Sequence, residues 1–118
     1  MQRELLLLRE MRDAAAAIRD LIGERTAQSI NADSMRRAAI LWHFTVLGEA
    51  ASQIPSEIKA RRDDVAWQAA TRLRNRIVHG YWSIDLALLV DTATDDLPAM
   101  ITGLDVAITD LEQADGRN

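Results

Sequence analysis

The sequence predicts an all-α fold, an antiparallel bundle of four to five helices. Apolar residues recur three and four positions apart along most of the chain, and no stretch alternates apolar and polar residues as a half-buried strand does. The 118 residues contain only two prolines and five glycines, so the connections between helices are expected to be short. A chain of this length with 48% hydrophobic residues is expected to form one domain over residues 1–118 without a metal or a disulfide.

The first helix is predicted by an apolar stripe that ends near Gly23. The stripe consists of Leu7, Met11, Ala14, Ile18 and Leu21 or Ile22. The four leucines before Arg9 form a run too short for a signal-peptide core or a membrane span. We therefore expect a cytoplasmic protein with no membrane anchor.

A second helix is predicted from a cap at Asn31, Asp33 or Ser34 to about Gln53, before Pro55. It carries two apolar stripes: Met35, Ala38, Ala39, Trp42, Val46 and Ala50, and Ile40, Phe44, Leu47, Ala51 and Ile54. A helix that is apolar on most sides is buried on more than one side. One stripe is therefore expected to face the bundle centre and the other either the same centre or another subunit.

A short helical turn through Ile58 and a third helix are expected after Pro55. Asp63 or Asp64 can cap the third helix, which ends at Gly80 and has an apolar face of Ala66, Ala70, Leu73 and Ile77.

The remaining sequence predicts a fourth helix that opens at Ser83 or Asp85. Pro98 either kinks this helix or begins a fifth. Residues 114–118 are expected to fray.

The charge of the chain is uneven along its length. The net charge of −4 argues mildly against a nucleic-acid binder, yet residues 59–79 hold six basic and two acidic side chains. Residues 80–118 hold eight acidic side chains and a single arginine. Either stretch is also consistent with an ordinary solvated helix face.

The absence of cysteine excludes a disulfide framework, thiolate metal ligands and a cysteine nucleophile.

The stretch from Arg72 to Trp82 concentrates the residues that can carry chemistry: three arginines, an amide, a histidine, the only tyrosine and a tryptophan. At about 100° per residue, Arg72, Asn75, Arg76 and His79 share one side of the helix, whereas Arg74 lies about 140° round from His79. Arg74 and His79 can therefore cooperate only if the helix end turns the histidine or if a second copy of the chain completes the site.

Histidine exchanges protons near neutral pH, and arginine offers a planar fork to phosphate oxygens. Together they suit metal-free cleavage of RNA, in which the ribose 2′-hydroxyl attacks its own phosphate and cations stabilise the charge that develops. The alternative reading is structural: His79 bonds the last carbonyls of the helix, and the arginines are surface charges.

The string Arg74-Asn75-x-x-x-His79-x-Tyr81 resembles the signature of HepT-like toxins, which belong to the HEPN group of small helical proteins. Further resemblances cover about three-quarters of the chain. They are Gly48-Glu49-Ala50-Ala51, Val65-Ala66-Trp67, Asp85-Leu86 and Asp95-Asp96-Leu97-Pro98.

This resemblance implies a homodimer with a metal-independent endoribonuclease site at the subunit interface and no cofactor. Arg74 would bind the scissile phosphate, His79 would donate or accept the proton, and Asn75 and Arg76 would support them. Tyr81 would receive AMP from an MntA-like nucleotidyltransferase antitoxin. The added charge and bulk beside the groove would then repel RNA. The resemblance thus implies that the protein is the toxin of a toxin–antitoxin system.

The sequence is also compatible with other functions. The chain could be a non-catalytic HEPN module that binds nucleotides or scaffolds a partner, or a helical dimerisation protein whose motif charges form salt bridges. His43, on a nearly apolar helix, is expected to be a buried or interface histidine. Glu49 could pair with Arg74 or Arg76, and Trp82 could stack on a nucleotide.

Overall fold

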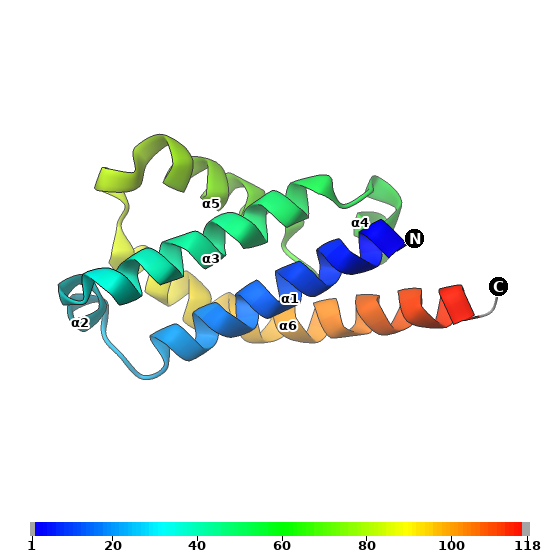
Figure 1. Ribbon diagram of the computed structural model, residues 1–118, viewed down its shortest axis with the longest axis horizontal. Helices are drawn as coiled ribbons and strands as arrows, with labels where there is room; N and C mark the ends of the chain where they lie inside the picture. Colours follow the sequence, from blue (N-terminus) through cyan, green and yellow to red (C-terminus); the bar gives the residue numbers. More distant parts are fainter. Residues whose placement is uncertain (1, 117–118) are drawn as a thin grey trace.

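Four long helices make up most of the fold, as the apolar periodicity predicts. A computed structural model describes residues 2–116, and in these the all-α prediction is confirmed (Figure 1). The long helices are α1 (Gln2–Ile22), α3 (Ser34–Gln53), α5 (Trp67–Gly80) and α6 (Leu86–Gly116). Shorter elements join them: α2 (Ala27–Ala32), α4 (Ser56–Arg61) and the 3₁₀ turn η1 (Tyr81–Ser83).

Successive long helices run antiparallel, and α3 lies between α1 and α5 (Figure 1). α6 packs along the other side of α1. The resulting body measures 51 × 28 × 21 Å, and its largest fully buried side chains are Leu8, Met11, Ile18, Ile30, Ile40, Leu41, Leu47 and Leu104. The helix that carries the motif, α5, therefore rests on α3 at one edge of the bundle.

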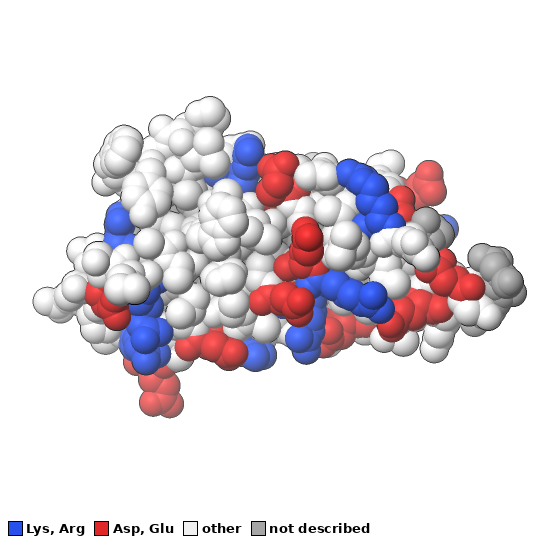
Figure 2. All heavy atoms as spheres, in the orientation of Figure 1, with Lys and Arg blue, Asp and Glu red and all other residues white. Residues whose placement is uncertain are grey.

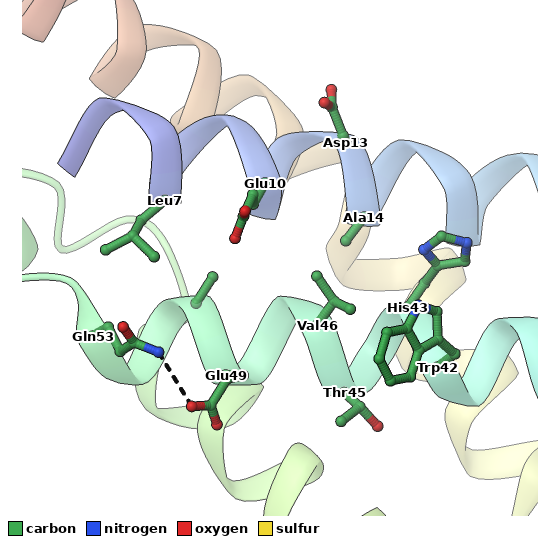
Figure 3. Close-up of a pocket in the computed structure, with 11 residues that line it drawn as sticks. Leu7, Glu10, Asp13, Ala14, Trp42, His43, Thr45, Val46, Glu49 and Gln53 are labelled. Carbon is green, nitrogen blue, oxygen red and sulfur yellow. Dashed lines mark hydrogen bonds between the residues drawn. The ribbon is translucent and has the colours of Figure 1, made fainter. Parts of the chain in front are cut away.

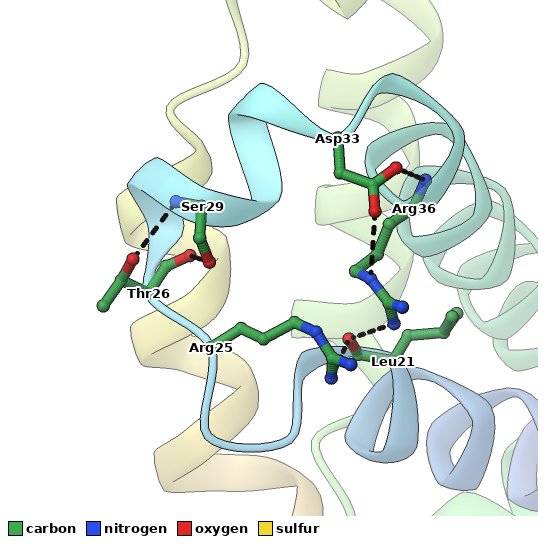
Figure 4. Close-up of polar contacts among 6 residues, drawn as sticks. All are labelled: Leu21, Arg25, Thr26, Ser29, Asp33 and Arg36. Carbon is green, nitrogen blue, oxygen red and sulfur yellow. Dashed lines mark hydrogen bonds and ion pairs between the residues drawn. The ribbon is translucent and has the colours of Figure 1, made fainter.

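The connection between α1 and α3 contains α2, a helix that the sequence analysis did not predict. α2 is six residues long and buries only Ile30, so it leaves no periodic apolar signal. Thr26 accepts from the amide of Ser29 at 3.1 Å and caps it (Figure 4). Asp33 does the same for α3 by accepting from the Arg36 amide at 3.1 Å, which confirms one of the three predicted caps.

The start of α5 differs from the prediction. The helix follows Ala66, which has no side-chain capping bond, so the expected cap at Asp63 or Asp64 is wrong. The Asp64 carboxylate instead pairs with Arg62, and the Trp67 indole donates to the Arg62 carbonyl at 2.9 Å. Ion pairing and the tryptophan thus order this turn without a carboxylate cap. The preceding α4 runs to Arg61, beyond the short turn expected through Ile58.

The last helix is continuous through Pro98, so the alternative in which this proline begins a fifth helix is wrong. Proline removes a backbone hydrogen bond, but apolar side chains on both sides of it, including Leu97 and Met100, are buried and keep the helix against the bundle.

The predicted cap at Asp85 is confirmed, because its carboxylate accepts from the Leu88 amide at 3.2 Å. The helix continues through Gly116, contrary to the expected fraying; residues 117–118 lie outside the described part of the chain.

The two apolar stripes of α3 have different surroundings. The stripe of Ile40, Phe44, Leu47, Ala51 and Ile54 is buried as predicted. In the other stripe Ala50 is buried, but Met35 is 84% and Trp42 62% exposed in the single chain. Figure 2 shows a large uncharged area over α5 and the adjoining part of α3, and mixed acidic and basic side chains over α1.

Within residues 2–116, no helix combines the length and apolar character needed to cross a membrane.

We expect the Asp33→Ala substitution to lower the melting temperature at neutral pH, because the first turn of α3 loses its cap. The hydrogen bond that the Arg36 backbone amide donates to the Asp33 carboxylate lowers the pKa of Asp33 below its ordinary value of 3.8. The stabilisation is therefore complete above that value and disappears as the pH falls through the folded-state pKa. Thermal unfolding of both proteins as a function of pH measures this: the difference should shrink in acid. A difference that is constant down to about pH 2 would contradict the role of the ionised cap.

Candidate active site

The motif residues occupy the second half of α5 and the turn that follows it. Arg72, Asn75, Arg76 and His79 are exposed, whereas Arg74 is partly buried with 31% of its side chain accessible. Ile77 and Ala70 on the opposite side of α5 are buried and anchor the helix to the core. The amphipathic pattern of α5 thus directs its polar residues outward.

Gly48 determines how closely α3 and α5 approach each other. A β-carbon at position 48 would lie 2.3 Å from the β-carbon of Arg74 and 2.4 Å from the Ala70 carbonyl oxygen. Neither distance is compatible with a side chain, and the oxygen belongs to the backbone. Glycine is therefore required at position 48, where α3 contacts the β-carbon of Arg74.

The Arg74 guanidinium is held by two neighbours. It forms an ion pair with Glu49 of α3, with 3.1 Å between nitrogen and carboxylate oxygen. It also donates to the Asn75 side-chain oxygen at 2.8 Å. Its Nε is buried without a hydrogen-bond partner. The Glu49 side chain is 48% exposed, so an anion could approach the arginine from the solvent.

His79 lies in the last turn of α5 and lines a hollow of about 280 Å³ between that turn and the start of α6. Arg76 lines the same hollow, together with Leu73, Gly80, Ser83, Ile84, Asp85, Leu88 and Leu89. An imidazole and a guanidinium therefore share one concave surface, where they could act on a phosphodiester.

Arg74 and His79 do not come together within one chain. Arg74 is directed to Glu49 on α3, whereas His79 lines the hollow beside α6. The separation follows from the roughly 140° between them on a straight helix, as the sequence indicates. Of the predicted residues, Arg74 groups with Asn75, and His79 groups with Arg76.

Tyr81 is the first residue of η1 and is partly buried against the core. The guanidinium carbon of Arg37, on α3, lies 5.4 Å from the centre of its ring, which is within cation–π range. The Trp82 ring meets Tyr81 edge-on at 5.8 Å between centroids, and Trp82 is 90% exposed.

Arg37 is not among the site residues that the sequence predicts. A signal was present, because Arg37 lies on the same face of α3 as Leu41, Phe44 and Gly48, the face that packs on α5. A charged residue at the end of an otherwise buried face indicates a polar site at that end.

A larger hollow, of about 510 Å³, lies between α1 and α3 (Figure 3). It is lined by residues that include Trp42, His43, Glu10, Asp13 and Glu49, and the Asp13 carboxylate points away from it (Figure 3). His43 is half-buried in the single chain, so it is not the fully buried histidine that was one of the two expectations. An interface position stays a prediction. The carboxylates of Glu10 and Glu49 would oppose the binding of a phosphate, so this hollow is poorly suited to RNA. Among residues 2–116, no group of three or more His, Asp or Glu side chains is arranged to hold a metal ion.

Comparison with known proteins identifies related sequences. The profile of a family described as "Ribonuclease HepT-like" matches residues 11–106. A protein named probable ribonuclease HepT from Thermococcus cleftensis is 24% identical over 93 residues, which cover 79% of this chain and 84% of the relative. A putative RNase from Methanocaldococcus jannaschii is 26% identical over 109 residues, covering 92% of this chain and 87% of the relative. No solved structure matches the chain with statistical significance.

We expect the Gly48→Ala substitution to reduce the free energy of unfolding by about 1–3 kcal/mol, because the new methyl group overlaps the Ala70 carbonyl and the stem of Arg74. Urea denaturation measures the change. Gly116→Ala is the matched control, since a β-carbon there has no atom within 4 Å. Equal stabilities of the two variants would contradict the close helix crossing.

Proposed function

The chain belongs to the ribonuclease HepT-like family, and from this premise we propose that it is an RNA-cleaving toxin with Arg74 and His79 in its active site. The observation that carries the proposal is the intact Arg74-Asn75-x-x-x-His79-x-Tyr81 string, with both catalytic candidates reachable from solvent. The names of the relatives, a probable ribonuclease and putative RNases, support the same reaction class.

In the proposed reaction, the ribose 2′-oxygen attacks the adjacent phosphorus and the bond from phosphorus to the 5′-oxygen breaks. The 2′-hydroxyl proton passes to a base, and the 5′-oxygen receives a proton as it leaves. His79 serves in one of these transfers because imidazole can accept and donate near neutral pH. Arg74 stabilises the negative charge that accumulates on the phosphoryl oxygens. None of these steps calls for a metal ion or a cofactor.

We place the complete site at a homodimer interface. Within one chain Arg74 and His79 have separate environments, so two chains are needed to bring them to one phosphate. Large apolar side chains are exposed on α3, α5 and the first turn of α6, and a partner subunit would cover them: Met35, Trp42, Val78 and Leu88. Before RNA binds, Glu49 and Asn75 hold Arg74 in position.

Regulation is proposed to act on Tyr81 through an MntA-like nucleotidyltransferase antitoxin. The tyrosine oxygen would attack the α-phosphorus of ATP, forming a phosphodiester while pyrophosphate leaves and the phenolic proton passes to a base. Tyr81 follows His79 by two residues, so the added negative charge would oppose the binding of RNA at the histidine.

A site shared between two subunits can be tested with dimers formed from two different variants. Arg74→Ala and His79→Ala should each reduce RNA cleavage by at least about 100-fold and relieve growth arrest in an expressing host. When the two variants are unfolded together and refolded as a mixture, heterodimers contain one site with both native residues. About a quarter of the wild-type activity should return, because half of the dimers are mixed and each has one of its two sites intact.

The measurement is the rate at which a fluorescently labelled RNA is cut, with each variant refolded alone as the control. No recovery in the mixture would contradict a site shared between subunits. Growth arrest that persists in both single variants would contradict the nuclease itself. A wild-type dimer that binds nucleotides but never cuts RNA would favour the non-catalytic HEPN module.

Co-expression with an MntA-like nucleotidyltransferase should increase the intact mass of the protein by one or more adenylyl groups and abolish RNA cleavage. Tyr81→Phe should keep its original mass and remain toxic, because phenylalanine lacks the acceptor oxygen. Intact-mass spectrometry followed by peptide mapping provides the readout. An unmodified, neutralised wild-type protein would indicate an antitoxin that acts by binding alone.

A further inference from the structure

Most arginines of residues 2–116 donate to a carboxylate, an amide or a backbone carbonyl. The exceptions are Arg37, Arg61 and Arg76. Arg76 lines the hollow beside His79, and Arg37 lies over Tyr81. Two of the three unpaired guanidinium groups therefore flank the end of α5.

Arg37 has the environment of an anion-binding residue. Its Nε is buried without a hydrogen-bond partner, so folding removes this donor from water without replacing the bond. The Arg37 guanidinium lies over the face of the Tyr81 ring, which attracts the cation but accepts no conventional hydrogen bond. The carboxylate nearest to Tyr81 in the sequence, Asp85, is occupied in capping α6. The terminal nitrogens of the Arg37 guanidinium are not among the buried unpartnered atoms, so a phosphate oxygen arriving from solvent could accept from them.

Trp82 adds a surface for a base. An indole that is 90% exposed gains little from packing in its own chain, and it meets the Tyr81 ring only edge-on. Its faces are thus available for stacking, and aromatic stacking is how proteins hold unpaired bases. Tyr81 contacts both Arg37 and Trp82, so one ring connects the cation and the stacking surface.

From this cluster we infer that Arg37, Tyr81 and Trp82 form a nucleotide subsite for single-stranded RNA. Trp82 stacks on an unpaired base, and Arg37 binds the adjoining phosphate. The subsite lies beside His79 in sequence and extends the proposed ribonuclease site, on which this inference rests. It assigns the substrate class, because a base paired within a duplex cannot present its face to Trp82.

The test measures binding separately from cleavage. The probe is a short, fluorescently labelled oligonucleotide with 2′-deoxyribose throughout, which lacks the attacking hydroxyl and cannot be cut by the proposed route. Its dissociation constant is determined by anisotropy at several salt concentrations, for the single strand and for the same strand in a duplex.

Trp82→Ala should weaken single-strand binding about tenfold, and Trp82→Phe should recover most of the loss because it retains an aromatic face. Arg37→Gln should weaken binding several-fold and reduce the slope of log affinity against log salt by about one, whereas Arg37→Lys should retain the slope. Arg61→Gln is the matched control, since Arg61 is also unpaired but ends α4, away from η1. It should behave as wild type.

If Trp82→Ala and Arg37→Gln bind as the wild type does while the wild type cuts RNA, the subsite is overturned and the ribonuclease proposal stands. Equal affinity for duplex and single strand would also overturn the subsite. If both variants lose binding but the wild type never cuts RNA, the subsite holds and the nuclease proposal fails. Unchanged melting temperatures of the variants ensure that binding losses do not come from unfolding.

Discussion

The contact between α3 and α5 at Gly48 is the constraint on which the candidate site depends. Because position 48 has no side chain, the stem of Arg74 and the Ala70 carbonyl lie directly against α3. That close approach places Glu49, the next residue, within ion-pair distance of the Arg74 guanidinium. It also brings the far end of α5 near the first turns of α3, where Arg37 meets Tyr81. A wider separation of the two helices would loosen both contacts.

Much of the fold could be predicted because burial imposes a period on the sequence. The stripes of α1 and α3 and the caps at Asp33 and Asp85 follow from local rules of helix formation. α2 could not be predicted in this way, since a single buried residue has no period. The start of α5 could not be predicted from local rules either. The Asp64 carboxylate could either cap α5 or pair with Arg62, and tertiary geometry decides for the ion pair. Pro98 is a similar case, because packing on both sides outweighs its local effect.

The candidate site was partly predictable for the same reason. Helical geometry alone separates Arg74 from His79, and the structure has them in different environments. Pairing of Arg74 with Glu49 was one of two options that the sequence allowed, and the helix crossing selects it. Arg37 lies outside the motif and more than forty positions from Tyr81, so only the packing of α3 on α5 reveals their contact.

The site residues follow one another along a single helix, so their arrangement depends on helical phase. Inserting one residue between Arg74 and His79 would rotate the histidine by about 100° about the helix axis and advance it by about 1.5 Å. The position of the histidine relative to Arg74 therefore depends on the number of residues between them as well as on their identity. A one-residue insertion or deletion between Arg74 and His79 would realign the histidine, whereas one in the loop before α5 would leave the spacing of the motif intact.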